Sequence, residues 1–216
     1  MIMKKSVYSL VLMDRLVQKV DQLAYENNTS RSNMANQILA EYLSMTPKQR
    51  TEDMFGRMEE LISACQGLQT TLNPSAHILS IKSVLAYKYN PTVRYSLALY
   101  PTSGETFGEL RVLFRTQNER LLDTLGRFFA VWIETERALR PGDHLIYKLG
   151  DGKMTRQLLA PPGAPHEALA EATVRYITLF DRAMKQYFAH RDEPDAARDA
   201  LRDAYRAYLN AETLFL

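Results

Sequence analysis

The sequence predicts an α+β protein that consists of a small N-terminal unit and a larger C-terminal domain. A strand-like segment at residues 4–13 precedes two short helical segments. Further on, apolar and polar residues alternate at 93–99 and 110–115, which predicts an antiparallel hairpin. Apolar residues at spacings of three and four over 118–139 predict a long helix packed on that sheet.

Composition places the chain among ordinary globular proteins. The 216 residues are 46% hydrophobic and 24% charged, with a formal net charge of +2. Residues 1–50 hold seven basic and four acidic side chains, a net +3, so the other 166 residues carry −1. A single cysteine, Cys65, excludes an intramolecular disulfide and predicts a reducing, cytoplasmic location. No apolar run approaches the length of a membrane span, so we expect no membrane partner.

The N-terminal unit is predicted to be strand, helix, turn and helix. Residues 4–13 contain neither Gly nor Pro and are rich in β-branched and aromatic types. Asp14 opens a helix to about Asn27, and a second helix spans about 31–44. So short a unit cannot bury its own apolar faces, and a lone strand has both edges unpaired. The simplest solution is a twofold dimer with antiparallel pairing of the two strands.

This arrangement resembles the ribbon-helix-helix family of DNA-binding proteins, which includes the Met and Arc repressors. The resemblance covers residues 4–45, through KKSVYSLVL and then LVQKVDQLAYENNTSRSNMANQILAEYL. Its most specific part is Ser30-Arg31-Ser32 at the opening of the second helix. The resemblance implies that the paired strands enter the major groove and that the start of the second helix binds a phosphate.

Carried over by position, the resemblance assigns a set of residues to DNA. They are Lys4, Lys5, Val7, Ser9, Val11, Thr29, Ser30, Arg31 and Ser32. Two valines on the groove-facing side of the strand offer no hydrogen bonds, which departs from the usual family pattern. Either the two lysines contribute more, or specificity is partly indirect through DNA shape. The alternative is an unliganded dimerisation module whose strand face is covered by the rest of the chain.

Residues 47–73 are expected to connect this DNA-binding domain, 1–46, to a C-terminal domain, 74–216. Apolar residues at spacings of three and four predict an amphipathic helix over 52–72. That helix either continues the dimer interface or packs on the following domain. The C-terminal domain is predicted to hold an antiparallel sheet of about four strands, from hairpins at 93–115 and 145–159. Helices at 118–139, 166–189 and 195–212 are expected on one of its faces.

The sequence offers no catalytic or metal-binding motif in this domain. Its histidines are isolated from one another, so we expect no metal site and no cofactor. The segment Gly150–Lys153 is best explained as a hairpin turn, and no nucleophile and base stand at a catalytic spacing, so an enzyme is not expected. A basic and aromatic cluster predicts either a secondary surface for anions or a solvated sheet face. The cluster comprises Lys82, Lys88, Arg94, Arg111 and Arg115 with Tyr87, Tyr89 and Tyr95.

The functional prediction is a homodimeric, sequence-specific DNA-binding transcriptional regulator, with a repressor as the expected kind. Its partners would be double-stranded DNA and a second copy, with assembly beyond the dimer left open. The C-terminal domain would add oligomerisation or the binding of an unknown protein or small-molecule effector. One alternative is an antitoxin-like or other protein-binding module with a DNA-binding N-terminus. The other is a DNA-tethered enzyme.

Overall fold

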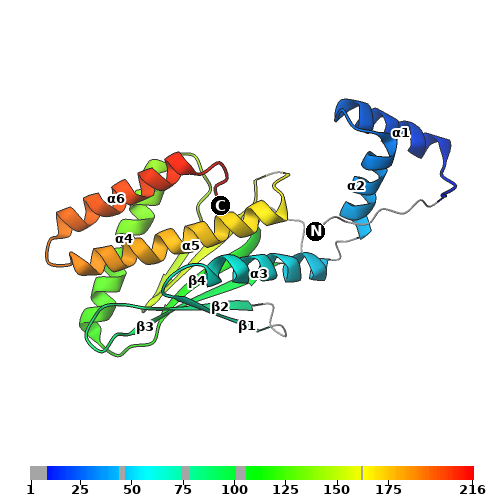
Figure 1. Cartoon of the computed structure of the whole chain (residues 1–216). Helices are drawn as coiled ribbons and strands as arrows, with labels where there is room; N and C mark the ends of the chain where they lie inside the picture. The colour runs from blue at the N-terminus through cyan, green and yellow to red at the C-terminus, as the bar shows by residue number, and fades with distance from the viewer. Residues whose placement is uncertain (1–8, 44–46, 74–77, 101–105, 162) are drawn as a thin grey trace. The chain divides into compact units, whose positions relative to one another are not determined.

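A computed structural model describes residues 9–43, 47–73, 78–100, 106–161 and 163–216 (Figure 1). The described residues form six helices and six strands, which confirms the α+β class. The chain divides into two compact units, residues 1–49 and 50–216.

The smaller unit contains α1 (Asp14–Glu26) and α2 (Arg31–Leu43), within about one residue of the predicted bounds. Asn28 in the turn between them has a φ of +49°, a conformation that asparagine tolerates better than most residues. Of the predicted strand, residues 4–8 lie outside the described part of the chain, and residues 9–13 have no regular secondary structure. The strand expected to pair with them would belong to a second copy, which a single chain does not contain.

The larger unit begins differently from its prediction. α3 (Pro47–Ser63) ends well before the predicted residue 72, and Leu68–Asn73 form strand β1 instead. The prediction was wrong because apolar residues continue at helical spacing beyond the end of the helix. Gly67, at a φ of +81°, turns the chain, and the β-branched pair Thr70 and Thr71 then favours a strand.

The sheet has six strands, where the sequence predicted about four. β1 pairs with β2 (Ile78–Val84), a segment whose pattern favoured no single structure. The other strands are β3 (Thr92–Leu99), β4 (Thr106–Phe114), β5 (Tyr147–Gly150) and β6 (Lys153–Leu159). Their order is β1-β2-β3-β4-β6-β5, and every neighbouring pair is antiparallel.

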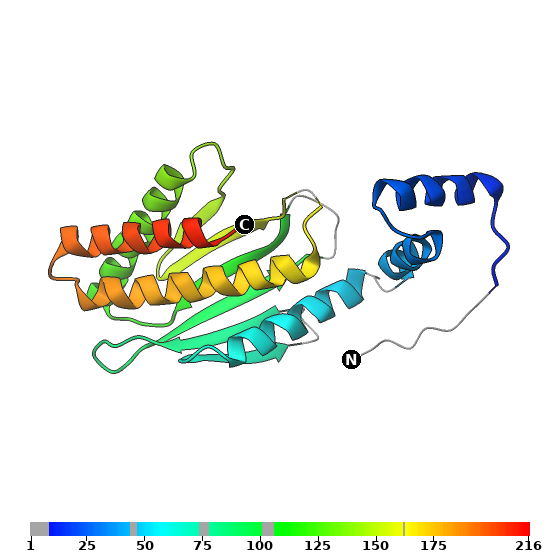
Figure 2. The ribbon, with the colours of Figure 1, turned by 45° about the horizontal axis from the view of Figure 1, so that its top comes forward.

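Helices cover one face of this sheet. α4 (Glu119–Leu139), α5 (His166–Ala189) and α6 (Pro194–Ala211) lie on the same side of the strands (Figure 2). Tyr95 and Leu97 on β3 and Leu110 on β4 point to that side and are fully buried. Side chains of α3 join the same core. No described helix is long and apolar enough to cross a membrane.

Candidate functional site

The start of α2 is the part of the predicted DNA site that the structure describes best. Ser30 caps the helix, because its Oγ accepts a hydrogen bond of 3.2 Å from the backbone N–H of Asn33. Arg31 and Ser32 are exposed, and Thr29 is half-buried. The first turn of a helix carries N–H groups without a partner in the helix, so this end favours an anion.

Arg31 is engaged within the unit. Its Nε and Nη2 donate hydrogen bonds of 2.5 and 2.6 Å to the two carboxylate oxygens of Asp21 on α1. The hydrogen bond from Arg31 lowers the pKa of the Asp21 carboxyl below its usual value. This bidentate pair joins the opening of α2 to α1, so Arg31 orients the helix start while Asp21 balances its charge.

The predicted strand residues are only partly described. Lys4, Lys5 and Val7 lie outside the described residues. Ser9 and Val11 are exposed. The structure therefore brings Thr29–Ser32 together at one helix start, and it does not place the strand face beside them.

The smaller unit exposes an unusual share of apolar surface. Only Val20, Ala24 and Met34 are buried in its core among the residues described. Nine of the thirteen exposed large hydrophobic side chains found among the described residues lie between positions 10 and 42. They are Leu10, Val11, Leu12, Met13, Leu16, Leu23, Tyr25, Leu39 and Tyr42, here called the exposed apolar set. Contiguous exposed apolar surface is characteristic of association sites.

The predicted basic and aromatic cluster is separated by the sheet. Arg94 and Arg111 point to the face that the helices leave open, whereas Tyr95 is buried on the opposite face and donates a hydrogen bond of 2.7 Å to Asp181. Lys88 lies over the ring of Tyr89 in a loop, 5.1 Å from its centroid. Arg115 follows β4 and is exposed, and Tyr87 packs edge-on against Phe188. The aromatic part of the cluster is therefore not a single stacking surface.

Sequence reasoning missed two lysines on that open face. Lys148 on β5 lies opposite Thr155 on β6, and Lys153 on β6 lies opposite Leu113 on β4. The predicted hairpin at 145–159 contained both residues. The register between β4 and β6 determines which face of the sheet these lysines occupy, because a shift by one residue would move every side chain of the strand to the opposite face.

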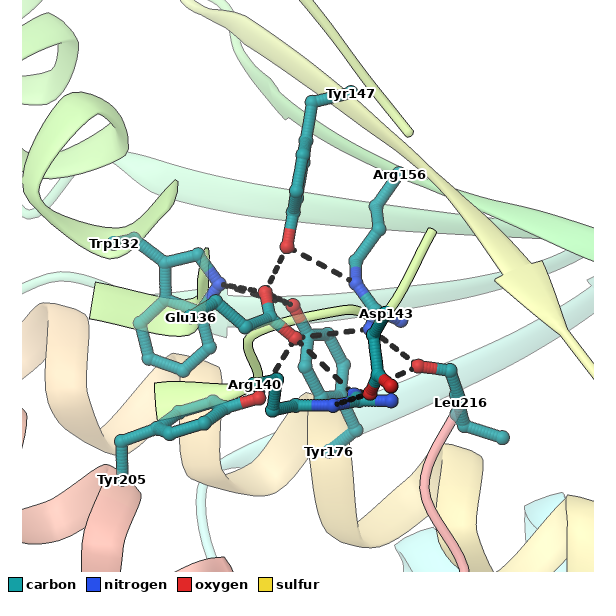
Figure 3. Close-up of polar contacts among 9 residues, drawn as sticks. All are labelled: Trp132, Glu136, Arg140, Asp143, Tyr147, Arg156, Tyr176, Tyr205 and Leu216. Carbon is teal, nitrogen blue, oxygen red and sulfur yellow. Dashed lines mark hydrogen bonds and ion pairs between the residues drawn. The ribbon is translucent and has the colours of Figure 1, made fainter. Parts of the chain in front are cut away.

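A buried polar network is the second feature that the sequence did not predict (Figure 3). Glu136 on α4 is fully buried, and its carboxylate accepts hydrogen bonds from donors on four other elements and from its own helix. The donors are Trp132, Tyr147, Arg156, Tyr176 and Tyr205. The sequence does contain a sign of this network. Glu136 follows Trp132 by four residues, so an acidic side chain lies on the apolar side of the helix.

Two arginines connect this carboxylate to the last residues of the chain. Arg156 on β6 is also fully buried, and its Nη2 lies 2.9 Å from Glu136 Oε1 and 2.6 Å from the main-chain oxygen of Leu216. Arg140 donates a second hydrogen bond of 2.9 Å to the same Leu216 oxygen. Arg140 also pairs with Asp143 at 2.6 Å. The network thereby ties α4, β6 and the segment after α6 together.

Burial keeps the groups of this network in defined protonation states. Burial and then the charge of Glu136 raise the pKa of the Tyr147 and Tyr205 phenols, which therefore stay protonated and act as donors. For Arg156, burial lowers the pKa while the Glu136 carboxylate raises it, and the net shift is upward. A buried pair of opposite charges with this many hydrogen bonds serves to position helices and strands.

A cavity of about 630 Å³ adjoins the network. Its wall includes Arg140, His144, Leu159, Phe215 and Leu216. Glu136 and Arg156 do not line this cavity, so Arg140 is the arginine of the network that a molecule inside it would contact. Within the described ranges, no group of three or more His, Cys, Asp or Glu side chains is placed to hold a metal ion.

Comparisons with protein-family models, with curated proteins and with solved structures find no match to this chain.

Proposed function

We propose that this chain is a homodimeric, sequence-specific DNA-binding transcriptional regulator that acts in the cytoplasm as a repressor. The observation that carries the proposal is the exposed apolar set on a unit whose described core holds three buried residues. Such a unit gains a sufficient core when a second copy covers its apolar surface. The resemblance of residues 4–45 to ribbon-helix-helix proteins supplies the form of that dimer.

Charge and helix geometry support DNA as the ligand of the dimer. Residues 1–50 carry a net +3, so a dimer presents about twice that charge from this region. The start of α2, where Ser30 caps the N–H of Asn33, offers the positive end of a helix to a phosphate. In the proposed complex, two strands from residues 4–13 pair in the major groove, and the two starts of α2 contact flanking phosphates.

The larger unit has no assigned chemistry in this proposal. Its roles would be oligomerisation or the binding of a protein or small-molecule effector. The cavity beside Arg140 is one candidate place for such an effector, and its wall also contains Asp143, which pairs with Arg140.

Gel-shift competition with genomic fragments at low salt tests the proposal. We expect the full chain to retain a small number of fragments against excess competitor DNA. Leu23→Glu places a charge within the exposed apolar set and is expected to abolish both dimer formation and fragment retention. Gln18→Glu introduces the same charge at an exposed polar position of α1 and should leave dimerisation intact. Failure of the wild-type chain to retain any fragment would contradict DNA binding.

A further inference from the structure

We propose that the open face of the six-stranded sheet forms a second contact with the phosphate backbone of double-stranded DNA. The inference rests on the proposed function, because it adds a site on the larger unit to the contact made by the smaller one. The open basic face is defined here by five side chains. They are Lys82, Arg94, Arg111, Lys148 and Lys153.

Strand register places these cations in two neighbouring rows. In the first row, Lys82 lies opposite Arg94, and Lys153 follows on the far side of Leu113. The second row places Arg111 and Lys148 on either side of Thr155. Neighbouring strands are about 4.8 Å apart and successive rows about 7 Å apart, so the charges cover a continuous area.

The charges on this face are poorly compensated within the described chain. Lys82 and Arg94 are direct cross-strand neighbours of like charge, an arrangement that disfavours the sheet, and neither forms an ion pair among the described residues. Glu109 is the acidic side chain that the described strands contribute to this face, and it already pairs with Arg111. An anionic ligand would relieve the repulsion between Lys82 and Arg94.

The uncharged residues of the face favour duplex phosphates over other anionic partners. Ser80, Ser96 and Thr155 lie among the cations, and short hydroxyls commonly donate to phosphate oxygens. Tyr100, beside Glu109 just after β3, is the aromatic side chain found at this face among the described residues, so the face lacks the several rings of the stacking platform typical of single-stranded DNA or RNA sites. It also lacks the buried aromatic anchors that dominate most protein interfaces.

The salt dependence of DNA binding by the full chain tests this surface. Lys82→Gln, Arg94→Gln and Lys153→Gln are combined in one sheet variant. A control variant removes the same charge from exposed helix positions through Arg120→Gln, Arg198→Gln and Arg202→Gln. Affinity for a retained duplex is measured over a range of salt concentrations. We expect the sheet variant to bind more weakly, with a salt slope smaller by about 0.9 for each phosphate that it no longer neutralises, whereas the control keeps the wild-type slope.

The outcomes separate this inference from the proposed function. A wild-type chain that binds DNA, with a sheet variant whose slope equals that of the control, overturns the sheet contact and leaves the proposed function in place. A sheet variant that changes the mass of the free protein assembly identifies a chain-to-chain surface and also overturns the contact. Absence of DNA binding by the wild-type chain overturns both. A conservative variant, Lys82→Arg with Arg94→Lys, keeps the charge and should keep the slope even if the neutral variant unfolds.

Discussion

Glu136 and Arg156 depend on each other because both are fully buried. Removing one charge leaves the other without compensation inside the core, which costs about 3–5 kcal/mol. We therefore expect Glu136→Met to lower the free energy of unfolding by that amount, measured by urea denaturation. The double variant Glu136→Met with Arg156→Met should be less destabilised than the single one. A double variant whose loss of stability equals the sum of the losses of Glu136→Met and Arg156→Met measured singly would show that the pair is not coupled.

Among single residues, the sequence predicted the cap of α2 but neither the partner of Arg31 nor the burial of Tyr95. Ser30 was expected at the opening of the second helix, and it caps α2 as the local pattern of Ser, Arg and Ser suggests. The partner of Arg31 was not predicted, since Asp21 is ten residues away and reaches it only through the turn between the helices. Tyr95 was misassigned to a surface cluster, although it alternates with Arg94 and so shares the apolar side of its strand, which the structure buries.

At the scale of elements, Gly108 fixes the approach of β3 to β4. A Cβ at this position would lie 2.6 Å from the carbonyl oxygen of Ala98. Because that distance is shorter than any ordinary contact, the backbone of one strand would have to move. We expect Gly108→Ala to cost on the order of 1–3 kcal/mol. Gly126 on α4 is the matched control, because a Cβ there meets no atom within 4 Å. Gly126→Ala should stabilise the helix by about 0.5–1 kcal/mol.

Thermal and urea unfolding of the two glycine variants checks this prediction. Gly108→Ala should lower the transition midpoint, and Gly126→Ala should raise it or leave it unchanged. A Gly108→Ala variant as stable as the wild type would contradict this prediction, because it would mean that β3 and β4 move apart at Gly108 without cost.

The elements that local patterns predicted well are those with long, uninterrupted periods. α4, α5 and α6 were expected within a few residues of their bounds, because each is long and amphipathic. β1 was missed because Cys65, Leu68 and Leu72 continue the spacing of α3 and only Gly67 marks the change. Lys148 and Lys153 were missed for a different reason, since strand order and register are not local properties.

At the scale of the whole molecule, buried phenols make stability sensitive to alkali. Burial, followed by the charge of Glu212, raises the pKa of Tyr208 to about 12, and burial also raises that of Tyr95. A phenol whose pKa is higher in the folded state contributes its full stabilisation at pH values below its unfolded pKa of 10.0. That contribution is lost as the pH rises through the folded value, so stability should fall between about pH 10 and 12.

Urea denaturation between pH 8 and 12 measures this loss. Each such phenol contributes a slope of up to about 1.4 kcal/mol per pH unit. Tyr208→Phe should reduce the slope with little change at pH 8, because the Tyr208 hydroxyl is buried without a hydrogen-bond partner among the described residues. A slope that is unaffected by this substitution would contradict the assignment to Tyr208.

The two units of the chain differ in how completely they bury their apolar side chains. The larger unit has an extensive core, whereas the smaller one leaves the exposed apolar set uncovered. A net charge of +2 over the chain conceals a basic N-terminal region, and it also conceals the basic face of the sheet. We infer that association through the smaller unit completes its core and assembles the DNA-binding surface.

Dimerisation of the smaller unit on DNA can be measured by sedimentation of the full chain with a labelled duplex retained from genomic DNA. We expect two chains in the smallest specific complex, and we expect Leu23→Glu to sediment as a monomer without the duplex. One chain per duplex would overturn dimeric binding, as would a Leu23→Glu variant that dimerises and binds DNA as the wild type does.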